Sequence, residues 1–565
     1  MHVDAAKARR AKSPKLYQRT RARTKKTLIA RYGARSVPRT PTELAAQSPD
    51  LVNLLRAAAT VSSLTLLSRV TGLIRDLLIS RVFGVSGATD AFNVAFRIPN
   101  LLRRLFAEGA FQQAFVPVLA DTRAQRGDDG MRHLVDHVAA TLFWTLLLVS
   151  LAGVVAAPAL VWIIATGLAH DAQTFDLATK MTRWMFPYIL CMSLVAFAAG
   201  ALNTFKRFAV PALTPVVLNL SFIACALWLA PRMATPILAL ALAVVIGGVL
   251  QLALQVPALY RIGMLPRVGN PLTGLRDENV RRILRLMLPA IFAVSVAQLS
   301  IIINTNIASH LPTGSVTWLA FADRLMEFPT ALLGVALGTV LLPSLSAAFA
   351  EQRSADYSRL LDWGLRLTLL LALPAAAGLG LLAEGLVGVL FQGGKFSWHD
   401  VQQTALALIG YAVGLIGLIA VKILAPGFYA QRDIKTPVKI AVSALIATQL
   451  ANLAFVPWLG HAGLAFSVSL GACVNAALLF AGLWRRRIFV PQPGWGGFAL
   501  RLALALGAMI AWLGWTRATI DWQAGQGLWA TRAIQLAAVI AAAGAIYFAA
   551  LWLLGFRPRD FVLRG

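Results

Sequence analysis

The sequence predicts an all-α protein that crosses a membrane about fourteen times, as two six-helix lobes followed by a helix pair. Of its 565 residues, 58% are hydrophobic and 13% are charged, and the mean hydropathy is +0.69. Soluble domains have about 45–50% apolar and about 25% charged residues. Apolar runs of about 20 residues, the length of a membrane-spanning helix, recur from Asn53 to the C-terminus. The chain is therefore expected to be a polytopic membrane protein.

The first 51 residues differ from everything after them. Residues 1–50 carry thirteen Lys and Arg against three acidic residues, and they lack the apolar run of a signal peptide. One interpretation is a disordered basic tail that contacts anionic lipid. The other, which we favour, is a mis-assigned start, with translation beginning near Val52. In both cases the tail is not expected to contribute to a core.

From Asn53 onward the sequence contains fourteen apolar spans. Their approximate centres are residues 70, 105, 150, 190, 220, 245, 295, 335, 370, 410, 445, 472, 507 and 542. Each is long enough for a helix that crosses the hydrocarbon core.

The connections between these spans alternate in charge. The even-numbered connections and the C-terminal tail contain clusters of Lys and Arg, whereas the odd-numbered ones are poor in cations apart from Arg232, Arg517 and Arg532. Cytoplasmic connections carry the excess of Lys and Arg in membrane proteins. The pattern predicts that both termini and all even connections lie in the cytoplasm. It also accounts for the net charge of +28 without nucleic acid as a partner.

A weak internal repeat suggests two lobes. Span two reads IPNLLRRLFAEGAFQQAFVPVLA and span eight reads FPTALLGVALGTVLLPSLSAAFA. Membrane carriers are often built from repeats with the substrate site between them. We expect an N-terminal lobe over residues 52–265, a C-terminal lobe over 266–487, and a helix pair with a short tail over 488–565.

Charged residues inside apolar spans mark the candidate site. An arginine at mid-bilayer costs a few kcal/mol or more, so it normally faces a water-filled cavity or a partner. We predict a cationic chamber in which four arginines bind the ligand and four further charged residues support them. The ligand-binding candidates are Arg69, Arg75, Arg103 and Arg324, and the supporting residues are Asp90, Arg97, Glu108 and Glu327.

Spacing predicts how the charges of the first span pair. Arg69 and Asp76 are seven residues apart and share one helix face, whereas Arg75 points about 120° away. An Arg69–Asp76 pair would lower the cost of burying both groups. Arg81, near the end of the span, is expected to extend to a membrane interface.

The other charged spans contain their own pairs. Arg104 and Glu108 are four residues apart, which favours an ion pair within the helix and leaves Arg103 freer to meet a ligand. In span eight, Arg324 and Glu327 are three residues apart and form a similar cluster.

The arginines point to a ligand with phosphate groups. A guanidinium is a planar fork of donors that stays charged and matches phosphate oxygens with two hydrogen bonds. The four candidates therefore suit a di-anionic or pyrophosphate group. A proton or sodium carrier would instead favour carboxylates.

Motifs for other chemistries are missing from the sequence. No G-x-x-x-x-G-K-[ST] nucleotide-binding motif occurs, and His133 and His137 lack the Glu of a zinc-protease motif. Cys191, Cys225 and Cys473 lie far apart in apolar runs and suggest neither a disulfide framework nor a metal site. We expect a transporter without a bound cofactor.

Four segments closely resemble a known family. They read NLLRAAATVSSLTLLSRVTGLIRDLLISRVFG, ATDAFNVAFRIPNLLRRLFAEGAFQQAFVP, ADRLMEFPTALLGVALGTVLLPSLS and GLIAVKILAPGFYAQRDIKTPVKIA. The family is MurJ (MviN), the bacterial lipid II flippases of the multidrug/oligosaccharidyl-lipid/polysaccharide exporter superfamily. The resemblance runs from Asn53 to about Phe561.

This resemblance implies a fold and a function. It implies fourteen helices in two six-helix lobes, plus a C-terminal pair that lines a hydrophobic groove. It implies a protein of the bacterial inner membrane that flips undecaprenyl-pyrophosphoryl-MurNAc-pentapeptide-GlcNAc (lipid II) to the outer leaflet for peptidoglycan synthesis. Membrane lipids and the cell-wall synthesis machinery are further expected partners. The central arginines of the family match the four candidates above.

The resemblance also bears on the driving force. Na⁺ coupling, H⁺ coupling and membrane potential are all open. Some members of the family bind sodium in the C-terminal lobe, and Asn304, Asn452 and Asn475 are the residues this sequence offers, without a complete match.

The sequence is compatible with several other functions. They are an exporter of another polyprenyl-pyrophosphate-linked oligosaccharide, a drug/cation antiporter of the same superfamily, a non-transporting scaffold of the cell-wall machinery, and a membrane transferase. A cationic chamber would repel the substrates of a cation antiporter. The sequence shows no carboxylate pair or metal cluster for a transferase.

Overall fold

The computed structural model describes residues 49–103, 111–523 and 529–557. Met1–Ser63 and Leu64–Gly565 are separate compact units. The description below concerns the second unit. Its described residues form helices and short connections, and their β pairing is confined to one isolated bridge between Gly393 and Phe396.

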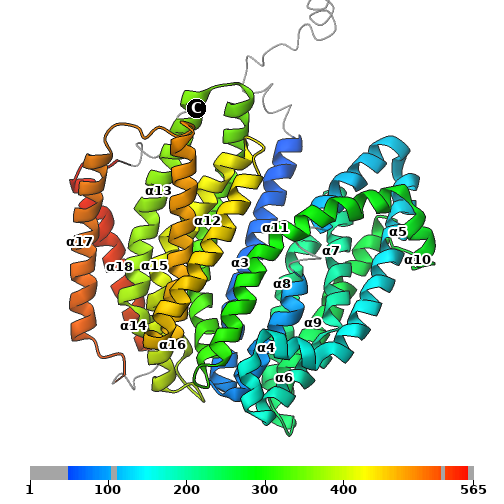
Figure 1. The fold of residues 1–565 in the computed structure, drawn as a ribbon, viewed down its shortest axis with the longest axis horizontal. Coiled ribbons are helices and arrows are strands. Elements are labelled where there is room, and N and C mark those ends of the chain that lie inside the picture. Colours follow the sequence, from blue (N-terminus) through cyan, green and yellow to red (C-terminus); the bar gives the residue numbers. More distant parts are fainter. Residues whose placement is uncertain (1–48, 104–110, 524–528, 558–565) are drawn as a thin grey trace, which may run out of the picture. The chain divides into compact units, whose positions relative to one another are not determined.

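The helices of the predicted N-terminal lobe follow one another with short connections (Figure 1). They are α3 (Pro49–Phe83), α4 (Gly87–Arg103), α5 (Phe111–Ile164), η2 (Thr166–His170), α6 (Ala172–Met185), α7 (Tyr188–Thr204), α8 (Ala209–Ala224), η3 (Cys225–Leu229), η4 (Ala230–Arg232) and α9 (Leu238–Arg261).

The rest of the chain is helical in the same way. Its helices are α10 (Pro271–Arg276), α11 (Glu278–Ser309), α12 (Ser315–Ala350), α13 (Ser354–Leu381), α14 (Ala383–Phe391), α15 (Trp398–Tyr429), α16 (Lys435–Arg485), α17 (Trp495–Thr519) and α18 (Trp529–Leu553).

The prediction of a polytopic all-α protein is confirmed. Thirteen of the fourteen expected span centres fall inside helices, and the centre at residue 105 lies outside the described residues. Within the described ranges, nine helices or continuous helix pairs are long and apolar enough to cross a membrane. The count of fourteen is therefore approximate.

Two long helices each contain a sharp reversal at a glycine. Gly127 in α5 has φ of 67° and Gly460 in α16 has φ of 55°. This left-handed region suits glycine because it has no Cβ. Gly127 divides α5 into the end of one predicted span and the whole of the next, whereas Gly460 divides α16 into two whole predicted spans. Each of these helices thus contains residues of two predicted spans.

Buried side chains of α4, α12 and α15 share one apolar core. It joins Ile98 of α4 to Leu319 of α12 and Val401 of α15. Many of its residues lie at the starts of these helices, next to the cation-poor connections. The two predicted lobes are therefore packed together at this end.

Two separate cores lie toward the opposite, cation-rich end. One packs Phe115 and Leu134 of α5 against Phe197 of α7. The other packs Leu361 of α13 against Phe428 of α15, with further residues from α12 and α16. The halves of the chain thus share buried residues at the cation-poor end and keep distinct cores at the cation-rich end. A fourth core joins α17 and α18 to α13 and α14.

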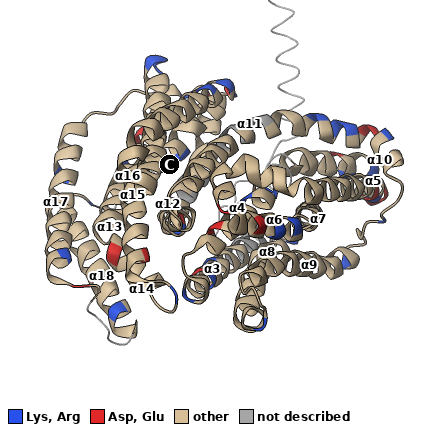
Figure 2. Ribbon diagram, turned by 60° about the horizontal axis from the view of Figure 1, so that its bottom comes forward, with Lys and Arg blue, Asp and Glu red and all other residues tan. Residues whose placement is uncertain are grey.

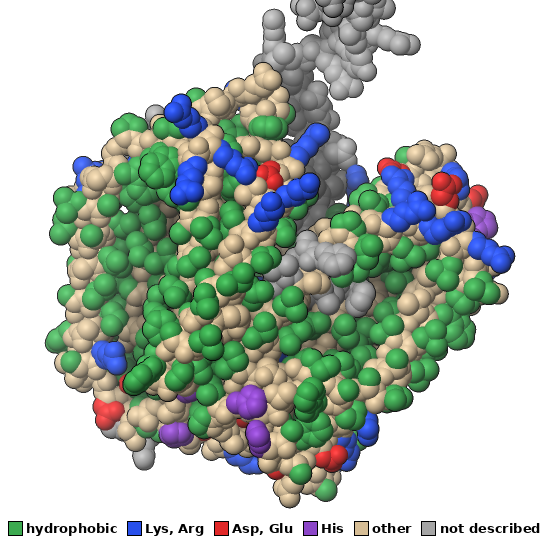
Figure 3. All heavy atoms as spheres, viewed as in Figure 1, with side chains coloured by type: hydrophobic (Ala, Val, Ile, Leu, Met, Phe, Trp, Pro, Cys, Tyr) green, Lys and Arg blue, Asp and Glu red, His purple; other side chains and the backbone are tan. Residues whose placement is uncertain are grey.

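The surface follows the same division. Figure 2 shows Lys and Arg positions along the start of α11, close to α10. In Figure 3, Lys and Arg gather along the upper rim of the visible face, and hydrophobic side chains cover most of the surface below them. An apolar belt bordered by cations is what a protein embedded in a bilayer presents.

Candidate functional site

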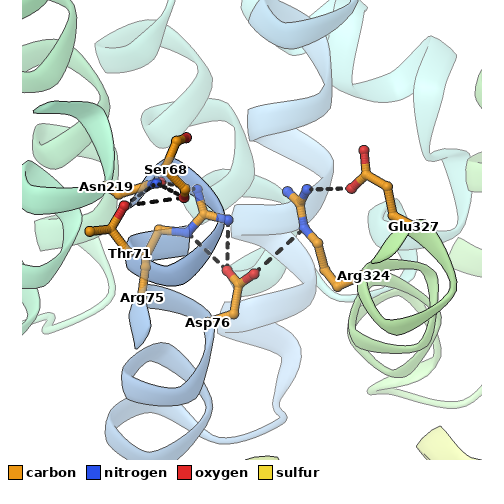
Figure 4. A network of polar contacts seen from close by, with 7 residues as sticks. All are labelled: Ser68, Thr71, Arg75, Asp76, Asn219, Arg324 and Glu327. Carbon is orange, nitrogen blue, oxygen red and sulfur yellow. Dashed lines mark hydrogen bonds and ion pairs between the residues drawn. The ribbon is translucent and has the colours of Figure 1, made fainter. Parts of the chain in front are cut away.

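The centre of the site is a carboxylate held between two arginines (Figure 4). Asp76 of α3 lies 2.7 Å from Nη2 of Arg75 and accepts a 2.8 Å hydrogen bond from its Nε. The other oxygen of Asp76 lies 3.8 Å from Nε of Arg324 on α12. The Asp76 carboxylate therefore links the two halves of the chain through α3 and α12.

Asn219 of α8 orients Arg75 from the other side. Nη1 of Arg75 donates to Oδ1 of Asn219 over 3.0 Å, and Nδ2 of Asn219 donates to Ser68 and Thr71 of α3. The Arg75 guanidinium also lies over the Phe222 ring, 5.4 Å from its centroid. Only 13% of the Arg75 side chain is exposed. Its position is thus fixed on several sides before any ligand arrives.

Arg324 is paired with carboxylates and keeps access to solvent. Its Nη1 donates to Glu327 over 3.3 Å, which confirms the predicted i,i+3 pair. Its side chain is 45% exposed, so the guanidinium remains accessible to an anion. Its contact with Asp76 is also the longer of the two, so it is the easier one for an anion to replace.

Arg69 and Lys422 add positive charge to the same region. Arg69 is exposed and makes no hydrogen bond or ion pair to a described residue. Lys422 of α15 donates to the Thr330 carbonyl over 3.3 Å and lies within electrostatic range of Arg69 and Glu327. The sequence reasoning did not assign Lys422. It was detectable, because it is the single Lys or Arg between Trp398 and Tyr429.

The predicted pairing of the first span is wrong. Asp76 pairs with Arg75 and Arg324 rather than with Arg69. The helical period places Arg69 and Asp76 on one face, but the long Arg75 side chain curls toward its neighbour. The guanidinium of Arg81 lies 5.9 Å from the centroid of the exposed Trp529 ring, and its extension to a membrane interface stays a prediction.

Arg97 and Arg103 of α4 lie beside other polar groups. Arg103 donates twice to Asn100, at 3.0 and 2.7 Å, and lies within electrostatic range of the buried Tyr188. Arg97 donates to Thr305 of α11. Glu108 and its predicted partner Arg104 lie outside the described residues.

Asp90 is a structural residue in this conformation, where the sequence suggested a group of the chamber. Its carboxylate is buried and accepts hydrogen bonds from the Gly314 and Thr317 amides, at 2.6 and 2.9 Å, and from the Thr317 hydroxyl at 2.6 Å. These groups belong to the start of α12. Asp90 of α4 therefore caps a helix of the other half, which closes the cation-poor end.

Two of the three asparagines that we considered as sodium ligands, Asn304 and Asn452, are in contact. Nδ2 of Asn452 donates to Oδ1 of Asn304 over 2.9 Å and to Oε1 of Gln449 over 3.0 Å. Oδ1 of Asn452 is buried and makes no hydrogen bond to the described part of the chain. Asn475 has no hydrogen bond to a described residue.

Together these observations define a class of protein, namely a helical membrane protein with two halves and a cationic site between them. Solved structures of membrane transporters share its fold. An inward-facing MATE-family multidrug transporter of the MOP superfamily aligns with a TM-score of 0.63, 15% identity, 76% of this chain and 98% of its own. A structure titled lipid II flippase MurJ, inward closed conformation, aligns with a TM-score of 0.71, 21% identity, 87% of this chain and 99% of its own.

The sequence comparisons identify the family more specifically than the fold does. The model of the family "Lipid II flippase MurJ" matches residues 79–531. The lipid II flippase MurJ of Burkholderia cenocepacia is 54% identical over 511 residues, which is 90% of this chain and 99% of that protein. The probable lipid II flippase MurJ of Vibrio cholerae is 38% identical over 514 residues, 90% of this chain and 97% of that protein. The chain belongs to the MurJ family.

Proposed function

We propose that this protein flips lipid II from the cytoplasmic to the periplasmic leaflet of the bacterial inner membrane, for peptidoglycan synthesis. The observation that carries the proposal is the Arg75–Asp76–Arg324 arrangement, in which two guanidiniums from different halves share one anion. A pyrophosphate carries the same kind of charge as the Asp76 carboxylate and more oxygen atoms. It is therefore suited to replace Asp76 as the shared partner.

The conformation suits loading from the cation-rich end. At the cation-poor end the halves share a core, and Asp90 caps α12. At the other end the cores of the two halves are distinct. We place the cation-rich end in the cytoplasm, together with both termini, on the positive-inside pattern. Lipid II would then enter with its pyrophosphate in the site and its polyprenyl chain in the bilayer.

Release requires the opposite end to open. The contact of Asp90 with Gly314 and Thr317 must break, and the halves must close at the cytoplasmic end. A pyrophosphate that gathers Arg75 and Arg324 around itself would favour that closure, because it satisfies both guanidiniums more fully than Asp76 does. This is alternating access, in which ligand binding shifts the balance between two states.

We propose membrane potential as the driving force. Each negative charge that moves from a negative interior to the outside gains about 2.3 kcal/mol per 100 mV. The residues do not fit a sodium site. Asn304, Gln449 and Asn452 supply neutral amides, and the side-chain oxygens of Asn304 and Gln449 already accept hydrogen bonds, which leaves the buried Oδ1 of Asn452 as one ligand oxygen among these three side chains.

The test is transport by the full chain in proteoliposomes that contain fluorescent lipid II. Accessibility of lipid II on each side is measured with a potassium diffusion potential, then with a pH gradient, and then without sodium. We expect flipping that follows the potential and continues without sodium. Dependence on sodium or on the pH gradient would overturn the assignment of the driving force.

The same assay separates the rival functions. A scaffold would not move lipid II at all, and a cation antiporter would move organic cations instead. An exporter of another polyprenyl-pyrophosphate oligosaccharide would prefer that substrate over lipid II in direct competition.

A further inference from the structure

A second basic site lies away from α3, α4 and α12. A pocket of about 340 Å³ is lined by residues of α13, of α17 and of the segments just before α17 and after α18. Its lining is Trp363, Arg366, Gly494, Gly497, Phe498 and Arg501, with Phe556. Two arginines, aromatic rings and glycines in one small pocket form a combination that the transport mechanism does not use.

Arg366 is held firmly in this pocket. Its Nε lies 2.8 Å from Asp362, outside hydrogen-bond geometry, and its Nη2 donates to the carbonyls of Gln492 and Pro493 at 3.2 and 3.1 Å. Its guanidinium lies 5.1 Å from the centroid of Trp495. Nη1 makes no hydrogen bond to a described residue, so one side of the fork is available.

Arg501 has no comparable structural role. It is exposed, makes no hydrogen bond or ion pair to a described residue, and lies 6.0 Å from the centroid of Phe556. Asp362 is the carboxylate next to Arg366, and it is already engaged by the Gln492 amide at 3.0 Å and the Trp495 indole at 2.8 Å. Among the described residues, two guanidiniums face one carboxylate, which leaves this part of the pocket positive.

The backbone beside the pocket adds room for an anion. Gly494 has φ of 93° and precedes α17, and no side chain caps the helix there. A Cβ added at Gly494, Gly496 or Gly497 would meet nothing within 4 Å. The positive end of the helix dipole favours an anion at this place, in support of the arginines.

An apolar pocket continues along the same two helices. It has a volume of about 190 Å³ and shares Phe498 and α13 with the basic pocket. Its lining includes Leu369 and Leu373 of α13 and Leu502 and Leu506 of α17. These residues lie further from the cation-rich end than Arg366 and Phe498 do. Residues 498–506 span about 12 Å of helix, enough to hold part of an acyl chain.

We propose that this composite site binds an anionic glycerophospholipid of the cytoplasmic leaflet, with its phosphate at Arg366 and Arg501 and an acyl chain between α13 and α17. Charge complementarity selects the anionic headgroup, and the adjoining apolar pocket selects a lipid over a free phosphate. Such a lipid would fasten the α17–α18 pair to the core that it shares with α13 and α14. Its placement in the cytoplasmic leaflet rests on the orientation proposed above.

The experiment measures lipid retention by the full chain without lipid II, so it does not depend on transport. The protein is purified into phosphatidylcholine nanodiscs with increasing phosphatidylglycerol, and bound lipid is counted by native mass spectrometry. We expect retained phosphatidylglycerol, and at least tenfold weaker retention in Arg501→Gln. Arg485→Gln, an exposed arginine at the same end and outside the pocket, is the matched control and should retain phosphatidylglycerol normally.

Two further measurements distinguish a lipid headgroup from free inorganic phosphate. Ala503→Trp fills the apolar pocket and should also weaken phosphatidylglycerol retention, whereas millimolar inorganic phosphate should not compete. Thermal unfolding of each variant in phosphatidylcholine shows that it is folded. Normal retention by Arg501→Gln, or equal retention of phosphatidylcholine, would overturn the proposal. Competition by phosphate together with normal retention by Ala503→Trp would show an ion site instead of a lipid site.

Discussion

Asp76 already occupies the position that the proposal gives to a ligand phosphate. It satisfies Arg75 at 2.7 Å but reaches Arg324 only at 3.8 Å. An incoming anion should therefore displace the Asp76 carboxylate more easily from Arg324 than from Arg75. The side chain of Arg324 is also the more exposed of the two. The residues that hold Arg75 in place, Asn219 and Phe222, do not depend on Asp76 and would keep the guanidinium oriented during the exchange.

Lysine should not replace the site arginines. An ammonium is a point charge and lacks the planar fork that binds two phosphate oxygens at once. Charge-assisted hydrogen bonds contribute roughly 1.5–3 kcal/mol, so Arg324→Lys should weaken lipid II binding by about ten- to a hundredfold. Arg324→Ala should be little worse. The same result is expected at Arg69, Arg75 and Arg103.

The measurement is lipid II binding, with complementation of a flippase-depleted strain at equal membrane abundance. Arg485→Lys serves as the control, because Arg485 is exposed and outside the site. If all four lysine variants bind and complement normally, the site supplies only diffuse positive potential.

The sequence singled out Arg75 and Arg324, which the structure brings to one carboxylate, because arginine is rare in apolar runs. The same signal was present, unused, at Lys422. The Asp76 pairing could not be predicted from helical periodicity, because a long flexible side chain reaches beyond its own helix face. The hydrogen bonds of Asp90 could not be predicted either, because their donors, Gly314 and Thr317, are more than two hundred residues away.

The hydrogen bonds between α4 and the start of α12 must break for the cation-poor end to open. Asp90 provides three hydrogen bonds to it, and Asn93 adds a fourth to Thr317 at 3.1 Å. Loss of a capping side chain costs about 1–2 kcal/mol, which changes a two-state ratio by a factor of about 5–30. Asp90→Ala should therefore shift the protein toward the state open at this end.

Cysteine accessibility can detect that shift. Val316 is buried in the core shared by the two halves. In a background without native cysteines, Val316→Cys should react with an impermeant thiol reagent several-fold faster when Asp90→Ala is present. Asp171→Ala is the matched control, because Asp171 caps α6 within the same half. Equal labelling of Val316→Cys alone, with Asp90→Ala and with Asp171→Ala would show that the Asp90 contact does not hold this end closed.

The connection between α15 and α16 should be sensitive to acid. Hydrogen bonds from Thr436 and Arg486 lower the pKa of Asp433 to about 2. A depressed pKa in the folded state stabilises the protein above the unfolded value of about 3.9, and this contribution is lost as the pH falls through about 2. Wild type should unfold at a higher temperature than Asp433→Asn above pH 4, and the difference should shrink below it. A difference that does not change over this range would contradict the assigned hydrogen bonds.

The distribution of buried residues explains which features of the fold could be predicted from the sequence. Span positions follow from local composition, so thirteen of fourteen centres fall within helices. The joining of the halves at one end is a long-range property. It depends on Ile98, Leu319 and Val401, from three separate helices, entering one core, which no local pattern encodes. The reversals at Gly127 and Gly460 also depend on single residues, although glycine at a predicted connection is a usable signal.

The orientation of the molecule in the membrane follows from the loop charges and can be tested directly. Cysteines are introduced one at a time into the cysteine-free chain beside exposed Arg126 and Arg486 at the cation-rich end. Two more are placed at the opposite end, one beside His170 and one at Trp458, which is 86% exposed and close to His461. Because the excess of Lys and Arg marks the cytoplasmic side, a reagent confined to the cytoplasm should label the first pair and miss the second. The same reagent confined to the periplasm should do the reverse. Labelling of His170 and Trp458 positions from the cytoplasm would invert the topology, and lipid II would then have to enter from the periplasm.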